Sequence, residues 1–96
     1  MRDKRIMVVC GFGLGSSMIL KMTLDSVLKE EKIKVETFCA DEATAKGELY
    51  DIVLTSQPLA HLFEDKEQPT IVINNFLSKE EVKAKSLNII KKICTL

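Results

Sequence analysis

Short apolar runs rich in β-branched residues alternate along the chain with longer segments that have helical periodicity. We expect strands at residues 5–10, 35–39, 51–55 and 70–73. Strands that alternate with helices through short connections pair in parallel by right-handed crossovers, and helices then cover both faces of the sheet. The sequence therefore predicts a single α/β domain over residues 1–96. Its four-stranded parallel sheet has the order 2-1-3-4, in a Rossmann-like three-layer sandwich.

The segments between these runs carry helix signals. Residues 16–30 have one apolar face, made of Leu20, Leu24, Val27 and Leu28. Asp41 is expected to cap a short helix, and residues 58–69 contain one or two further helical turns between two prolines. Ser78 and Glu81 have the spacing of a capping box at the start of the last helix. That helix is predicted to bury one side, made of Val82, Ser86, Ile89, Ile90 and Ile93.

Composition and charge exclude several classes of protein. The 14 basic and 14 acidic side chains balance and only 5% of residues are aromatic, so no nucleic-acid partner is expected. No apolar run approaches the ~20 residues that span a bilayer, and the first run is too short for a signal peptide. The three cysteines have neither zinc-site spacing nor an even count, which favours a reduced, cytoplasmic setting without metal or cofactor.

The stretch VVCGFGLGSSM places Cys10 at the end of the first predicted strand, followed by a glycine-rich turn. Ligands of such sheets bind at the carboxyl ends of the strands near the topological switch point, so chemistry is expected here. A dinucleotide fingerprint requires a glycine where Ser16 stands, and a Walker A loop requires a lysine nearer than Lys21. Neither nucleotide-binding motif is therefore complete.

The spacing Cys-x5-Ser-Ser favours a cradle for a phosphoryl group. Glycines allow successive backbone N–H groups to point inward, and the start of the following helix adds its positive end. Two serine hydroxyls can act as further donors. The same surroundings lower the pKa of a thiol and would make Cys10 a nucleophile at neutral pH. The predicted phosphate-binding residues are Gly11, Phe12, Gly13, Leu14, Gly15, Ser16 and Ser17.

Two other interpretations of this turn stay open at the level of sequence. Cys39 closes a strand predicted to neighbour the first one, so Cys10 and Cys39 could form a redox or regulatory thiol pair. A small buried residue at a strand end explains Cys39 more simply, and Cys94 is expected to be a packing residue of the last helix. The turn could also be purely structural, with glycines that serve packing and an inert cysteine.

In the segments VCGFGLGSSMILKM, DIVLTS and NNFLSKEEV the chain resembles the enzyme IIB components of the phosphoenolpyruvate-dependent sugar phosphotransferase system (PTS). It is most similar to the ascorbate type, and more distantly to the galactitol and lactose/cellobiose types. The resemblance implies that Cys10 accepts a phosphoryl group from a phosphohistidine of a IIA partner. The group would then pass to a carbohydrate held by a membrane-embedded IIC permease, with this chain in the cytoplasm beside the membrane.

The loop also resembles that of the low-molecular-weight tyrosine phosphatases, which have a Cys-x5-Arg arrangement. Ser16 stands where the phosphatase arginine would be, and the two arginines, Arg2 and Arg5, lie near the opposite end of the first strand. Without that bidentate donor a phosphocysteine would be hydrolysed slowly. A carrier is therefore expected rather than a phosphatase.

Several other residues lie near the expected site. The docking surface expected for the IIA and IIC partners consists of Phe12, Leu14 and Met18. Thr55 and Ser56 end the third predicted strand at the same edge of the sheet and could line the pocket. His61, the single histidine, follows that strand and is expected at the surface.

Overall fold

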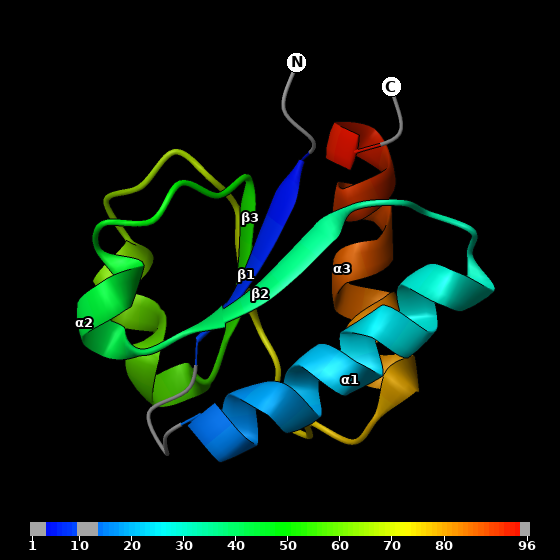
Figure 1. Cartoon of the computed structure of the whole chain (residues 1–96), viewed down its shortest axis with the longest axis horizontal. Coiled ribbons are helices and arrows are strands. Elements are labelled where there is room, and N and C mark those ends of the chain that lie inside the picture. The colour runs from blue at the N-terminus through cyan, green and yellow to red at the C-terminus, as the bar shows by residue number, and fades with distance from the viewer. Residues whose placement is uncertain (1–3, 10–13, 95–96) are drawn as a thin grey trace.

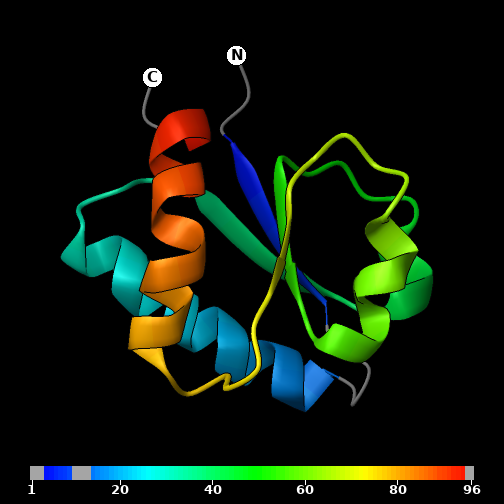
Figure 2. The same ribbon diagram turned by 180° about the vertical axis from the view of Figure 1, so that it is seen from behind.

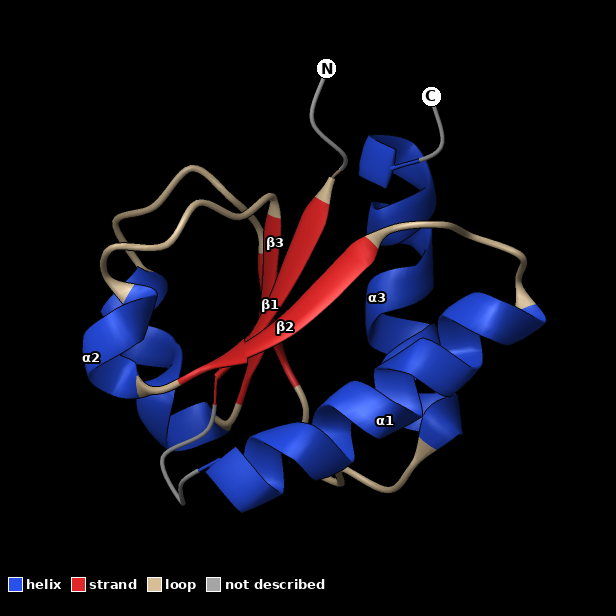
Figure 3. Ribbon diagram, in the orientation of Figure 1, coloured by secondary structure: helices blue, strands red, loops and turns tan. Residues whose placement is uncertain are grey.

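The computed structural model describes residues 4–9 and 14–94. The elements in chain order are β1 (Arg5–Val9), α1 (Leu14–Glu30), β2 (Glu36–Ala40), α2 (Glu42–Ala45), β3 (Ile52–Thr55), the 3-10 helix η1 (Gln57–Phe63), β4 (Thr70–Val72) and α3 (Lys79–Cys94). The four strands form one parallel sheet in the order β2-β1-β3-β4 (Figure 1; Figure 3). The predicted α/β class and strand order are confirmed.

Helices cover both faces of this sheet, with α1 and α3 on one face and α2 and η1 on the other (Figure 2). Successive residues of β1 point to opposite faces, as in any strand. Ile6 and Val8 are fully buried in the core beneath α1 and α3, whereas Met7 and Val9 are fully buried in the core beneath α2 and η1. A strand buried on both faces explains why β1 is apolar throughout.

The two long helices pack as their periodicity predicts. The buried face of α1 contains Leu20, Leu24, Val27 and Leu28. On α3, Val82, Ser86 and Ile90 are fully buried, while Ile89 and Ile93 are half-buried against the same core. Helix α1 begins at Leu14, two residues before the predicted start at Ser16. Gly15 therefore belongs to its first turn, although glycine is a poor helix former.

The short-range caps are formed in part as predicted. The carboxylate of Asp41 accepts a hydrogen bond from the amide of Thr44 at 2.6 Å and caps α2. At α3, the Ser78 hydroxyl accepts from the amide of Glu81 at 3.0 Å. The reciprocal half of the capping box is absent from the described residues, because the Glu81 carboxylate instead accepts from the amides of residues 74–75.

Helix α1 ends in a left-handed turn that directs the chain into β2. Lys32 has φ 58°, and the Ile33 amide donates to the carbonyl of Leu28 at 2.9 Å. The Lys32 amide donates to the carbonyl of Lys29 at 3.2 Å. This is the Schellman pattern, in which glycine usually occupies the left-handed position. A lysine there carries backbone strain that glycine would relieve.

Candidate functional site

The predicted phosphate loop connects the central strand to the first helix. Strand β1 ends at Val9 and α1 begins at Leu14, so Cys10, Gly11, Phe12 and Gly13 form the connection and lie outside the described residues. Helix α1 has 17 residues, and its N-terminus follows the loop directly. An N-terminus of this kind presents unpaired N–H groups and the positive end of the helix dipole.

Residues 14–18 of the predicted site form the first turns of α1. Gly15 is exposed, and a Cβ atom there would meet no atom of the described residues within 4 Å. Packing therefore gives no reason for glycine at this position. Ser17 is fully buried, whereas Met18 is 55% exposed, as a docking residue must be. Leu14 and Ser16 lie in the same turns of the helix.

The end of β3 lies beside the end of β1. Thr55 pairs with Val9 on one side and with Val72 of β4 on the other, and its carbonyl accepts from the amide of Ile73 at 2.9 Å. Its side chain is fully buried, and Ser56 is only 7% exposed. Neither hydroxyl has a hydrogen-bond partner in the part of the chain that the structure describes. Buried hydroxyls are normally paired, so this edge of the sheet is unusual.

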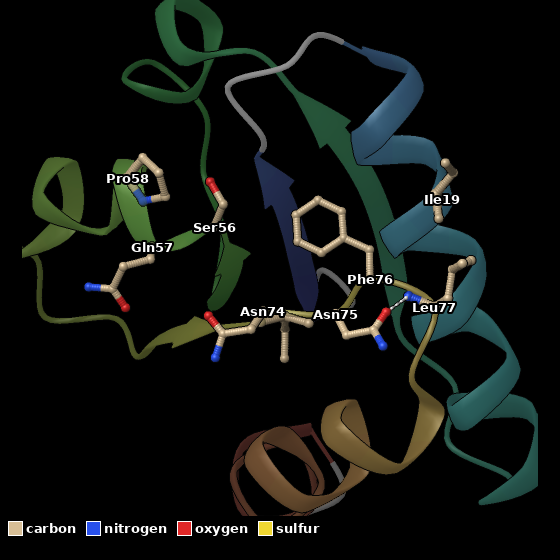
Figure 4. A pocket seen from close by; sticks show the side chains of 9 residues that line it. Ile19, Ser56, Gln57, Pro58, Asn74, Asn75, Phe76 and Leu77 are labelled. Atoms are coloured by element: carbon tan, nitrogen blue, oxygen red, sulfur yellow. Dashed lines mark hydrogen bonds between the residues drawn. The ribbon is translucent and has the colours of Figure 1, made fainter.

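A hollow of about 530 Å³ opens at the carboxyl ends of β3 and β4 (Figure 4). Its size is that of a small-molecule pocket. The lining residues come from α1, from the start of η1 and from the loop after β4: Ile19, Ser56, Gln57, Pro58, Ile73, Asn74, Asn75, Phe76 and Leu77. Ser56, one of the two hydroxyl residues considered for the pocket, lines this hollow. Thr55 is not among the lining residues, because it shares a sheet face with Val9 and Val53, beneath η1 and α2.

Sequence reasoning did not assign the loop over residues 74–77 to the site, although this loop forms one wall of the hollow. Two signals pointed to it. Residues 74–77 directly follow the fourth strand, and ligand sites of parallel sheets lie at that end. The NNFLS stretch also belongs to a segment that carries the family resemblance.

Glu81 at the start of α3 holds this loop in place. Its carboxylate accepts from the amide of Asn74 at 2.7 Å and from that of Asn75 at 2.8 Å. The Lys85 ammonium donates to the same carboxylate at 2.6 Å and to the carbonyl of Val72 at 3.0 Å. The Asn74 amide, followed by Lys85, lowers the pKa of Glu81 from 4.5 to about 2. The carboxylate is therefore ionised throughout the physiological pH range.

Two further contacts shape the loop. The Thr23 hydroxyl of α1 lies within hydrogen-bond distance of the Phe76 carbonyl, which ties the loop to the first helix. The Asn75 side-chain oxygen accepts from the Leu77 amide at 3.0 Å (Figure 4). The loop is thus anchored both to α3, through Glu81, and to α1, so its position beside the hollow is well defined.

Other residues considered from the sequence lie away from the hollow. The guanidinium of Arg5 stacks 4.2 Å from the Phe38 ring centroid, pairs with Glu36 and donates to the Leu49 carbonyl at 2.7 Å. These contacts occupy Arg5 at the amino end of β1, where it cannot replace a phosphatase arginine. His61 is exposed on η1, as expected.

Cys39 is half-buried on β2 and pairs in register with Val8. Burial raises the pKa of its thiol, and the nearby carboxylate of Asp25 adds to the rise against the opposing charge of Lys21. Cys39 is therefore mostly protonated at neutral pH and is a weak nucleophile. This favours its interpretation as a packing residue over that of a redox partner.

An exposed apolar patch lies next to the hollow. It consists of Met18, Ile19, Met22 and Leu77, which are 44–77% exposed. Ile19 and Leu77 line both the hollow and a second, smaller depression between α1 and the start of α3. Met18, which the sequence predicts to be a docking residue, thus belongs to a larger apolar patch that includes Leu77 of the loop after β4.

The described part of the chain has neither a cluster of metal-ligating side chains nor a helix that could span a membrane. Residues 4–9 and 14–94 contain no group of three or more histidine, cysteine or acidic side chains placed to hold a metal ion. Within the same ranges, no helix has the length and apolar character needed to cross a bilayer.

Comparison with known proteins gives consistent matches. Residues 5–86 match the family model described as "PTS system, Lactose/Cellobiose specific IIB subunit". The ascorbate-specific PTS system EIIB component of Escherichia coli is 33% identical over 91 residues, covering 92% of this chain and 90% of that protein. The proteins of the same description from Salmonella typhimurium and Shigella dysenteriae are 34% and 33% identical, with the same coverage.

Proposed function

The chain belongs to the IIB family of the phosphoenolpyruvate-dependent sugar phosphotransferase system, and we propose that it is a phosphocarrier in which Cys10 is the phosphoryl acceptor. The observation that carries this proposal is the connection between Val9 and Leu14. In the sequence Cys10 directly follows Val9, the last residue of β1, and α1 begins four residues later at Leu14, which supports a role for the thiol near the helix N-terminus. A thiol at a helix N-terminus has a lowered pKa, so a thiolate is favoured there at neutral pH.

The loop is proposed to bind the phosphoryl group through its backbone. Residues 11–17 combine three glycines with the first turn of α1, whose N–H groups and positive dipole end stabilise an anion. Gly15 supports this role, because packing does not require a glycine there and its missing Cβ leaves room for close approach. Ser16 and Ser17 would complete the set of donors, most directly through their backbone amides because the Ser17 side chain is buried.

The proposed reaction has two phosphoryl transfers. In the first, the Cys10 thiolate attacks the phosphorus of a phosphohistidine on a IIA partner whose ring is protonated on its other nitrogen. The N–P bond breaks, an S–P bond to Cys10 forms, and the ring leaves as neutral imidazole. In the second, a hydroxyl of the carbohydrate held by a IIC permease attacks phosphorus, the S–P bond breaks, and the thiolate is regenerated. The hydroxyl proton passes to a base of the acceptor complex or to solvent. The loop N–H groups stabilise the charge on the phosphoryl oxygens in both steps.

Ascorbate or a related carbohydrate is the proposed acceptor, because the most similar relatives described above are ascorbate-specific components. On this proposal the chain works in the cytoplasm and meets the membrane through its IIC partner. We propose that IIA and IIC contact the exposed apolar patch described above, which consists of Met18, Ile19, Met22 and Leu77. Phe12 and Leu14 are proposed to belong to the same contact surface. Met18 and Met22 have flexible side chains that suit two different partner surfaces.

Slow hydrolysis of the phosphocysteine is part of the same proposal. A phosphatase of this loop type uses an arginine that binds two phosphoryl oxygens at once. Arg5 is held by Phe38, Glu36 and Leu49 at the other end of β1. The phosphorylated chain should therefore persist long enough to meet its acceptor.

The test is phosphorylation of the full chain. Incubation with phosphoenolpyruvate, the general phosphotransferase proteins and a matching IIA should add one phosphate to the intact mass. Cys10→Ser should not pass phosphate onward, whereas Cys39→Ser, the matched control, should behave as the wild type. If the chain gains no phosphate and peroxide instead links Cys10 to Cys39, a redox function replaces the one proposed.

A further inference from the structure

The hollow at the carboxyl ends of β3 and β4 contains a buried hydroxyl group that has no partner among the described residues. Ser56 is 7% exposed and lines the hollow, and its Oγ atom makes no hydrogen bond to any described residue. An unpaired hydroxyl at the wall of a cavity costs free energy in the free protein. A ligand that exchanges a hydrogen bond with it would remove that cost, so the feature points to a polar ligand.

The remaining walls have the chemistry of a carbohydrate site. Side-chain amides of Gln57 and Asn74 lie around the same hollow, and neither has a hydrogen-bond partner among the described residues (Figure 4). The amide of Asn75 uses its oxygen for the Leu77 amide, which leaves its NH₂ group as a donor. The ring of Phe76 adds an apolar surface between Ser56 and α1 (Figure 4).

The hollow lacks charged groups of its own. None of the nine described residues that line it is acidic or basic. Glu81 and Lys85, which lie behind the loop, are paired with each other and with backbone groups. A phosphate dianion would find no fixed cation here, whereas hydroxyl groups would find both donors and acceptors.

The hollow lies at the edge of the sheet where β1 ends. Ser56 follows Thr55, which pairs with Val9, the residue that directly precedes Cys10. The carboxyl ends of parallel strands meet at one edge of the sheet, so a molecule in the hollow lies on the same edge as the end of β1, which Cys10 follows in the sequence.

We propose that this hollow is a subsite for the polyhydroxylated acceptor, so that this chain contacts the carbohydrate itself instead of leaving recognition wholly to the IIC permease. The inference rests on the proposed phosphocarrier function. Ser56 and the amides of Gln57, Asn74 and Asn75 exchange hydrogen bonds with hydroxyl groups of the acceptor, and Phe76 covers one apolar face of it. These contacts orient the acceptor toward the phosphocysteine.

The test separates charging of Cys10 by IIA from its discharge to carbohydrate in membranes that contain IIC. Ser56→Ala and Asn74→Ala should be charged at the wild-type rate, but their discharge should be about three- to tenfold slower, through a higher KM for the carbohydrate. Matched controls are Asn88→Ala and Gln68→Ala, which remove exposed amides that do not line the hollow and should change neither step. Ser56→Ala breaks no hydrogen bond to a described residue, so it should fold.

Direct binding gives a second readout. Titration of the isotope-labelled full chain with L-ascorbate or galactitol should shift the backbone amide signals of residues 56–57 and 74–77, and inorganic phosphate should not shift them. Wild-type discharge kinetics in Ser56→Ala and Asn74→Ala, with charging intact, would overturn the subsite and leave the phosphocarrier role standing. Failure of the wild type to be charged would overturn both.

Discussion

Replacement of Thr55 by valine should make the protein more stable, because the Thr55 hydroxyl is buried without a partner among the described residues. The side chain is fully buried between β1 and β4 at the end of β3. A hydroxyl buried in this way costs about 1–3 kcal/mol relative to a paired one. Valine has nearly the same shape and no polar atom to leave unpaired. The free energy of unfolding should therefore rise by about 1–2 kcal/mol.

Thr23→Val is the matched control with the opposite sign. Thr23 is also buried, but its hydroxyl lies within hydrogen-bond distance of the carbonyls of Ile19, at 3.1 Å, and Phe76. Valine at this position leaves the Phe76 carbonyl without its donor from α1. The free energy of unfolding should fall by about 1 kcal/mol. The same substitution, threonine to valine, should thus change the free energy of unfolding in opposite directions at the unpaired hydroxyl of Thr55 and at the paired hydroxyl of Thr23.

Urea unfolding followed by far-ultraviolet circular dichroism, under reducing conditions, measures both changes by linear extrapolation. Thermal unfolding should give a Tm shift of roughly 4–8 °C for each kcal/mol in a domain of this size. The m-values should be unchanged, so that differences in midpoint report stability. A Thr55→Val protein that is as unstable as Thr23→Val would refute the reasoning, since the Thr55 hydroxyl must then have a partner.

Three further substitutions test other features of the structure. The folded-state pKa of Glu81 lies near 2, below its ordinary 4.5, so its stabilisation is full above about pH 4.5 and is lost as the pH falls toward 2. Glu81→Gln should lower the free energy of unfolding at pH 7 by about 1–2 kcal/mol and remove that part of the acid dependence; a variant with wild-type acid unfolding would contradict the loop contacts. Because burial raises the pKa of the Cys39 thiol, iodoacetamide at pH 7 should modify Cys10 first, and Cys39→Ala should be charged by IIA at the wild-type rate; rapid alkylation at Cys39 would argue for the redox alternative. Lys32→Gly should raise the unfolding free energy by about 0.5–1 kcal/mol, because glycine adopts a φ of 58° without strain, and a loss of stability would show that lysine is not strained there.

The capping box predicted at the start of α3 shows how tertiary contacts can change which groups a side chain binds. Ser78 and Glu81 have capping-box spacing, and the half that depends on the helix start alone is formed. The Glu81 carboxylate, however, faces two loop amides and the ammonium of Lys85, and three donors outweigh the one at Ser78. No pattern within the helix could reveal this, because it depends on how the chain returns from β4.

The sequence by itself determined the class of fold, the order of the strands, the buried faces of α1 and α3, and the family to which the chain belongs. These features follow from periodicity, crossover handedness and short motifs, all of which act over a few residues or along one element. Only the tertiary structure decided that Ser56 lines a hollow while Thr55 faces the opposite core, and that the loop over residues 74–77 forms the wall beside them. The physical reason is that burial and pairing of a hydroxyl depend on side chains contributed by distant segments, which meet only when the sheet is assembled.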